Sequence, residues 1–121
     1  FHVTAGKINQ VSDIHGFFER DAENAPVWSE GTAGAALAYY LCKAPVKGDF
    51  FHREIEKMMT ENGGIIYATE NAYDFSISPS TAGTTWFIFY ELKLNPFKPD
   101  RKTTKSVTKY MKGRKKLSAK K

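Results

Sequence analysis

Two carboxylate side chains stand beside aromatic residues, and their types and spacing are those best suited to acid–base chemistry. Glu30 follows Trp28 by two positions in the expected first turn of a helix, and Asp74 lies between Tyr73 and Phe75 in a polar loop. A helix N-terminus favours an ionised carboxylate, so Glu30 is the stronger candidate for a catalytic or binding group. The alternatives are that Glu30 only complements the helix dipole and that Asp74 is a solvated acid or a local turn cap.

Three aromatic side chains are candidates to line a cleft near these acids: Trp28, Tyr67 and Trp86. Trp86 falls inside a strongly apolar segment, where a large aromatic side chain is commonly part of the core, and that alternative stays open. No spacing in the sequence establishes that Glu30 and Asp74 converge.

The sequence predicts no cofactor and no metal site. His2, His15 and His52 are widely scattered, and a single cysteine, Cys42, excludes an internal disulfide framework. Cys42 lies in an apolar helical run, so we expect a buried, inert thiol. The Gly63-Gly64 pair follows a predicted helix instead of opening one, and it lacks the Lys-Ser/Thr signature of a phosphate-binding loop.

Charge divides the chain into two unequal parts. Residues 98–121 hold eleven Lys or Arg and one acid, a net charge of +10, whereas residues 1–97 hold seven bases and twelve acids, a net charge of −5. A basic segment of this kind can bind nucleic acid through phosphate contacts or lie on an anionic membrane surface. The alternative is a disordered, solvated tail.

The compartment is left open by the sequence. No stretch approaches the roughly 20 consecutive apolar residues of a membrane-spanning helix. The first residues lack the charged and apolar regions of a signal peptide, so no such signal is expected.

Three helices are expected to position the candidate residues. Their predicted ranges are 29–43, 50–61 and 81–94, and residues 1–27 read mostly as loop. Residues 65–68 are expected to form a short extended piece between the second and third helices. The predicted caps and stops are Ser29 or Asn24 for the first helix, Asp49 and the Asn62-Gly63-Gly64 run for the second, and Ser80 or Thr81 and Asn95-Pro96 for the third.

The second helix has an ordinary amphipathic pattern, with one apolar stripe and one wet side. Its apolar stripe consists of Phe51, Ile55, Met58 and Met59, and its other faces carry Arg53, Glu54, Glu56 and Lys57. The first helix instead is built from small residues, and the third carries five consecutive large apolar or aromatic residues at 86–90. Both are expected to need burial on nearly every side. Three helices are too few to supply it, so the sequence predicts missing partners, either further chain or a second subunit.

Three linked motifs carry a family resemblance over about residues 26–97. They are W-x-E-G-T-A from Trp28, G-G-I-x-Y-A-T from Gly63, and A-x-T-x-W-F-I-F from Ala82 closing on N-P-F. In this order the chain resembles the C-terminal part of bacterial six-hairpin toroid proteins of the glycosidase-like superfamily. These proteins are several hundred residues long, so the chain would supply only the last hairpin or two. The sequence departs from the family pattern at Gly34, where a larger polar residue such as Gln is usual.

The resemblance implies an all-α toroid of alternating inner and outer helices, with a carbohydrate cleft at one end of the ring. The chain is then expected to be a partial toroid at 1–97 followed by a basic tail at 98–121. Hydrolysis of a glycosidic bond needs two carboxyl groups, roughly 5–5.5 Å apart for retention or about 6.5–9.5 Å for inversion. Glu30 and Asp74 would be the acids, and Trp28, Tyr67 and Trp86 would form the sugar platform. We expect the chain to be non-catalytic by itself, and to act if a second copy or a partner chain completes the ring.

Overall fold

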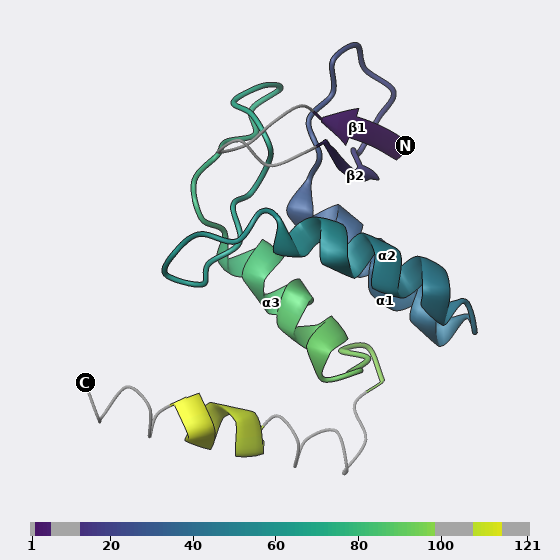
Figure 1. Cartoon of the computed structure of the whole chain (residues 1–121), viewed down its shortest axis with the longest axis vertical. Coiled ribbons are helices and arrows are strands. Elements are labelled where there is room, and N and C mark those ends of the chain that lie inside the picture. The colour runs from purple at the N-terminus through teal and green to yellow at the C-terminus, as the bar shows by residue number, and fades with distance from the viewer. Residues whose placement is uncertain (1, 6–12, 99–107, 115–121) are drawn as a thin grey trace.

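The described part of the chain is mostly helical (Figure 1). The computed structural model describes residues 2–5, 13–98 and 108–114. Its elements are, in chain order, β1 (His2–Ala5), β2 (Ile14–Phe17), α1 (Ser29–Leu41), α2 (Pro45–Glu56) and α3 (Thr81–Glu91). Within the described ranges, we find no helix with the length and apolar character needed to cross a membrane.

Two short strands correct the expectation of an all-α fold whose residues 1–27 are mostly loop. β1 and β2 pair antiparallel, with His2 opposite Phe17 and Ala5 opposite Ile14. Burial alternates along β2, because Ile14 and Gly16 are buried while His15 and Phe17 are partly exposed. Each strand has only four residues, which is too short for a period of two to stand out in the sequence.

The strand pair also changes the surroundings of α2. Glu54, which the helical pattern assigned to a wet face, is buried. Its carboxylate accepts a hydrogen bond from the amide of His15 in β2 at 2.7 Å and pairs with the ammonium of Lys57 at 2.7 Å. A buried carboxylate needs such partners, so Glu54 attaches α2 to β2 instead of facing solvent.

α1 and α3 run in the same direction, and α2 runs in the opposite direction. At one end, Ser29 of α1 lies directly against Gly83 of α3. At the other end, the rings of Tyr40 and Tyr90 lie 6.1 Å apart, and the first turns of α2 approach the same place. A Cβ atom at Gly48 would lie 2.8 Å from the carbonyl oxygen of Ala36. α1 and α3 are therefore parallel neighbours, and α2 runs back along them.

Two groups of buried side chains form the core. The larger joins the loops to the helices and contains Ile14, Val27, Ala33, Ile55, Met58, Ile65, Ile66 and Phe87. The second lies between the helices and contains Ala36, Leu37, Phe51 and Tyr90. Trp86 packs against both groups. The predicted apolar stripe of α2 is thus buried at Phe51 and Ile55; Met58 and Met59 both follow the helix, and Met58 is buried whereas Met59 is exposed.

α1 and α3 end in the same way. In each, the amide two residues past the C-cap bonds back five residues, Ala44 to Tyr39 and Leu94 to Phe89, in a Schellman motif. The left-handed residue of each motif is a lysine, Lys43 or Lys93. α3 therefore ends at Glu91, before the Asn95-Pro96 stop. Cys42, the C-cap of α1, is exposed, which corrects the expectation of a buried thiol.

α2 begins earlier and ends earlier than its sequence pattern predicts. It starts at Pro45, which suits the first turn of a helix because that position needs no donor. Gly48 lies inside the helix because the backbone of Ala36 leaves no room for a side chain there. After Glu56 the chain leaves the helix, and Gly63, with a φ of +83°, belongs to a separate turn closed by the Thr60 amide on the Gly64 carbonyl.

The predicted cap is right for α3 and wrong for α1. Ser80 caps α3, since its hydroxyl accepts a hydrogen bond from the Gly83 amide at 3.1 Å. At α1 the N-cap residue is Trp28, which has no capping side chain, and Ser29 is the first helical residue. The hydroxyl of Ser29 instead donates to a distant carbonyl, that of Tyr67. The extended segment predicted at 65–68 is present as isolated bridges to Met59, Pro79 and Trp28.

Neither α1 nor α3 is enclosed on all sides by the described residues. One face of α1, which we call the covered face, is buried and contains Ser29, Thr32, Ala33, Ala36 and Leu37. An adjoining set of positions, which we call the open face, is partly or fully exposed and contains Glu30, Gly34, Ala38 and Leu41. α3 buries only Gly83, Phe87 and Tyr90. A partner that would cover the remaining surface stays a prediction.

Part of the basic segment is helical. Residues 108–114 form a short helix in which all side chains but that of Tyr110 are exposed. The expectation of disorder is therefore wrong for these seven residues. The remainder of the predicted tail, from residue 99 to 107 and from 115 to 121, lies outside the described residues.

Candidate functional site

The three sequence motifs meet at the N-terminal ends of α1 and α3. The amide and the hydroxyl of Ser29 both donate to the carbonyl of Tyr67 at 3.0 Å, which joins the first motif to the second. Ile65 joins the second motif to the third: its amide donates to the hydroxyl of Thr84 at 2.9 Å, and its carbonyl accepts from the amide of Ser80 at 2.8 Å. Segments separated by more than thirty residues thus form one hydrogen-bonded junction.

Glu30 lies in the first turn of α1, on the open face. Gly34 is one turn further along the same face, and of the side chains that the structure describes, that of Trp86 lies within 4 Å of a Cβ placed there, at 3.9 Å. Residues four apart in a helix are neighbours on its surface. Glu30 therefore stands one turn above the place where the Trp86 indole of α3 borders α1.

Trp86 packs against the core and also against two further aromatic rings. One part of the indole packs against the two core groups. Another part meets Phe89 edge to face at 5.4 Å and Phe97 at 5.9 Å between ring centroids. Phe97 is 83% exposed. We call Trp86, Phe89 and Phe97 the aromatic row; its Trp86 borders the open face of α1 at Gly34.

Trp28 and Tyr67 belong to a second aromatic group, at the N-terminal end of α1. The indole of Trp28 lies on Gly31 and meets Phe75 edge to face at 6.0 Å, while Tyr67 stacks flat on Phe75 at 5.0 Å with an interplanar angle of 8°. The indole N–H of Trp28 is shielded from solvent yet has no hydrogen-bond partner among the described residues. The structure therefore brings Trp28 and Tyr67 together through Phe75.

Asp74 sits at the exposed tip of a two-residue hairpin. The amides and carbonyls of Ala72 and Phe75 bond to each other, and Tyr73 and Asp74 have φ values of 53° and 67°, as a type I′ turn requires. The neighbouring Tyr73 hydroxyl donates to the carbonyl of Glu23. Among the described residues no hydrogen bond or ion pair joins Asp74 to Glu30, so the structure does not bring the two acids into contact.

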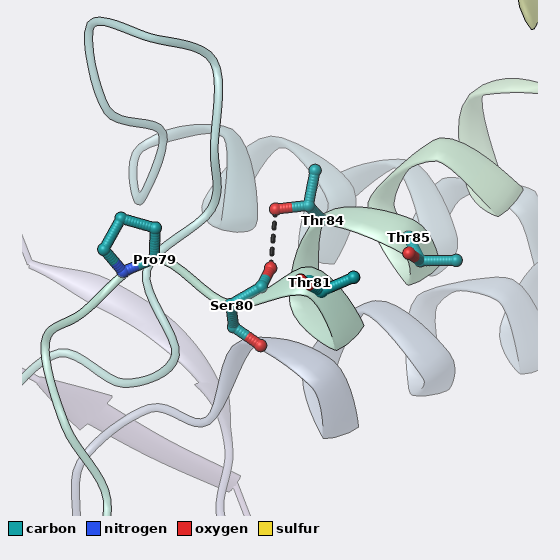
Figure 2. A pocket seen from close by; sticks show the side chains of 5 residues that line it. All are labelled: Pro79, Ser80, Thr81, Thr84 and Thr85. Atoms are coloured by element: carbon teal, nitrogen blue, oxygen red, sulfur yellow. Dashed lines mark hydrogen bonds between the residues drawn. The ribbon is translucent and has the colours of Figure 1, made fainter.

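A small hollow lined by hydroxyl groups lies at the start of α3 (Figure 2). Its volume is about 260 Å³, and its lining residues are Pro79, Ser80, Thr81, Thr84 and Thr85. Figure 2 shows the Thr84 hydroxyl bonded to the Ser80 carbonyl, at 2.7 Å. Thr81 and Thr85 lie away from the side of α3 that buries Gly83, Phe87 and Tyr90, and Glu30 does not line this hollow. The sequence feature that could have indicated this hollow is the hydroxyl-rich run at 80–85.

A larger, mostly aromatic groove lies where α1, α2 and the strands meet. Its volume is about 460 Å³, and its lining residues are His2, Phe17, Tyr39, Val46, Lys47, Phe50 and Phe51. Lys47 is its one ammonium group, 5.6 Å from the ring centroid of Tyr39. None of the candidate site residues lines it.

A charged group that sequence reasoning missed joins the C-terminal ends of α1 and α3 to α2. The hydroxyl of Tyr90 donates to the carboxylate of Asp49, and the ammonium of Lys93 lies 3.4 Å above the Tyr90 ring and 3.9 Å from Asp49. The hydrogen bond from Tyr90 lowers the pKa of Asp49, and burial together with this bond raises the pKa of Tyr90. Burial lowers the pKa of Lys93, against the opposing effect of Asp49 and Glu91.

His52, noted in the sequence only as scattered, is a packing residue. Its ring stacks on Phe87 and Tyr90 at 4.3 Å each, and its Nε2 atom lies 2.7 Å from the carboxylate of Glu91. Across the part of the chain that the structure describes, no three His, Cys, Asp or Glu side chains gather as a metal site would require.

Comparisons with protein-family models, with curated proteins and with solved structures return no match to this chain.

Proposed function

We propose that this chain is an arc of an α/α toroid that binds carbohydrate on the open face of α1 and the aromatic row. The arrangement of the helices supports the first half of the proposal. α1 and α3 are parallel neighbours with α2 running back beside them, as two inner helices and one outer helix of a toroid would be. The junction of the three motifs at one end of the parallel pair supports a site at that end.

The observation that carries the binding site is the partly exposed indole of Trp86 beside Gly34. Because Gly34 has no side chain, the indole borders α1 there, and among the described residues it is the side chain that lies within 4 Å of a Cβ placed at Gly34. Phe97 extends the aromatic surface outward. Sugars present their C–H groups to such surfaces, and the apolar contact favours binding.

Glu30 would supply the polar contact to the sugar. Its carboxylate lies one turn above Gly34, and a carboxylate accepts hydrogen bonds from sugar hydroxyl groups. Hydrolysis would need a second carboxyl group roughly 5–9.5 Å away. The described residues place no other acid in contact with Glu30, so we propose binding for this chain and turnover only for a completed ring.

A glycan array, followed by calorimetric titration of the bound oligosaccharides, tests this proposal. Glu30→Gln keeps the size of the side chain and removes its charge, and we expect it to weaken binding about tenfold or more. Glu61→Gln is the matched control, since Glu61 is an exposed acid in the turn after α2. We expect Glu61→Gln to leave binding unchanged.

A second pair of variants separates the aromatic contact from the charge. Phe97→Ala removes an exposed ring of the aromatic row and should weaken binding several-fold at little expense in stability. Val46→Ala is its control, because Val46 is equally exposed and lies on α2. Failure of the unmodified protein to retain any glycan, or equal losses in the variants and their controls, would contradict the proposal.

A further inference from the structure

We infer that the aromatic groove between α1, α2 and the strands binds a small planar aromatic carboxylate, with the ring of the ligand among the aromatic side chains and its carboxylate at the Lys47 ammonium. This inference is independent of the proposed carbohydrate site, because none of the seven residues that line the groove belongs to the open face of α1 or to the aromatic row. It rests on the packing of the floor of the groove, on the exposure of its rim and on the charge that lines it.

The floor of the groove is a fixed aromatic surface. Phe51 is 8% exposed, and the centroid of its ring lies 4.7 Å from that of Phe17 and 5.8 Å from that of Tyr39. The rings of Tyr39 and Phe51 are nearly parallel, with an interplanar angle of 13°. Because these rings hold one another in place, the floor can receive a ligand without rearranging, and such preorganisation favours binding.

The rim of the groove is apolar and open to solvent. Val46 is 83% exposed and Phe50 is 45% exposed, and the two are four positions apart on α2. Residues at this spacing are neighbours on a helix surface, so they form one apolar edge beside the floor. The volume of the groove, about 460 Å³, falls within the range of small-molecule sites, roughly 300–1,000 Å³. The groove therefore has room for a ligand of one or two rings.

The lining of the groove carries a positive charge and no negative one. Lys47 makes no ion pair among the described residues, and its ammonium lies 5.6 Å from the centroid of the Tyr39 ring. None of the seven lining residues is acidic. The acids Asp49 and Glu54 of α2 bond to groups outside the groove. The anionic group of a ligand would thus meet an ammonium that has no carboxylate partner.

The same lining decides among the ligands that aromatic surfaces bind. Ring faces attract cations, but the Lys47 ammonium repels a cationic ligand. A sugar needs several hydrogen-bonding groups along its edge, and three of the lining side chains have polar atoms, those of His2, Tyr39 and Lys47. A planar ring needs no polar partner, since it makes offset or edge-to-face contacts with rings such as Phe50 and Phe51. An aromatic ring with one carboxylate matches both the apolar surface and the single ammonium.

Calorimetric titration of the full chain with 2-naphthoate tests the inference, with 2-naphthamide as a neutral probe of nearly the same shape. We expect 2-naphthoate to bind with a dissociation constant below about 1 mM, and 2-naphthamide to bind about fivefold more weakly because it cannot pair with the ammonium. Lys47→Gln should weaken the binding of 2-naphthoate about fivefold and leave that of 2-naphthamide unchanged, which also shows that the groove of the variant is intact. Lys43→Gln is the matched control, since Lys43 is an exposed lysine outside the groove, and it should change neither affinity.

The variant Phe50→Leu tests the aromatic contact. Leucine keeps an apolar side chain but removes the ring, so both probes should bind several-fold more weakly. Phe97→Leu is its control, because Phe97 is an exposed ring of the aromatic row outside the groove, and it should leave both affinities unchanged. Four results would overturn the inference: no saturable binding of 2-naphthoate, equal affinities for the two probes, equal effects of Lys47→Gln and Lys43→Gln, or a loss of binding in Phe97→Leu but not in Phe50→Leu.

Discussion

The covered and open faces of α1 use small residues for different reasons. On the covered face, Ala36 allows the backbone of α2 to approach so closely that Gly48 cannot carry a side chain. At the same face, Ser29 lies directly against Gly83 of α3. On the open face, a Cβ atom at Gly34 would meet, among the described residues, just the Trp86 ring at 3.9 Å. Small size is therefore a packing requirement on one face and not on the other.

This difference shows that small residues in a helix do not by themselves indicate burial. The covered face is fixed by the approach of its neighbours, and any change there must be absorbed by a close-packed core. Among the described residues, no close neighbour constrains the side chains of the open face in this way. Residues on that face can therefore take part in binding without disturbing the core. The candidate residue Glu30 belongs to that second face.

The largest expected effect comes from two leucines one turn apart. Leu37 is 2% exposed on the covered face, and Leu41 is 46% exposed on the open face. We expect Leu37→Ala to lower the free energy of unfolding by about 2–5 kcal/mol, because it leaves a cavity between the helices. Leu41→Ala should lower it by less than about 1 kcal/mol. Urea denaturation measures both values, and equal losses would mean that the open face is covered in solution.

Replacing two glycines by alanine should change the free energy of unfolding by less, and in opposite directions. Gly83→Ala places a Cβ atom against the hydroxyl of Ser29, and we expect the free energy of unfolding to fall by about 1–3 kcal/mol. Gly34→Ala has room for its Cβ and favours the helix, so the same quantity should rise by about 0.4–1 kcal/mol. Thermal and urea unfolding measure both. A destabilising Gly34→Ala would show that something packs on the open face.

The smallest expected effect is on the pH dependence of the free energy of unfolding, and it arises from the hydrogen bond between Tyr90 and Asp49. Because the hydrogen bond from Tyr90 lowers the pKa of Asp49 below its ordinary 3.8, the folded state binds fewer protons at this site than the unfolded chain. The resulting stabilisation is complete above pH values near 3.8 and is lost as the pH falls through the lowered pKa. Tyr90→Phe should therefore flatten the acid limb of a plot of stability against pH.

The control for this measurement is Tyr39→Phe, which removes a hydroxyl from the aromatic groove that makes no hydrogen bond among the described residues. We expect its acid limb to match that of the unmodified protein. An unchanged acid limb in Tyr90→Phe would show that the Tyr90–Asp49 bond does not form in solution.

Much of the helical framework could be predicted from periodicity and capping. The start of α1 at Ser29, the capping of α3 by Ser80 and the extended piece at 65–68 are confirmed. The prediction for the first turn of α2 was wrong. Gly48 is required there by the close approach of the Ala36 backbone and not by local helix preference. Propensity gives way to tertiary packing at that position.

The candidate site was less predictable, because it depends on which faces meet. The sequence could place Glu30 in a first turn, but not establish that Gly34 would border Trp86. Phe97 was noted only as part of a helix stop, although its ring contacts Trp86. The strands β1 and β2 were missed since four residues carry too little pattern, and with them the burial of Glu54.

The hydrogen bonds of Ser29 also constrain how the protein acquires its fold. α1 has no capping side chain at Trp28, and Ser29 bonds instead to a carbonyl 38 residues further along the chain. With Gly31 and Gly34 in its sequence, α1 is a weak helix by itself. During synthesis its first turn stays incomplete until Tyr67 has left the ribosome. Completion of α1 and closure of the long loop are then one folding event, with the slower rate that distant contacts impose.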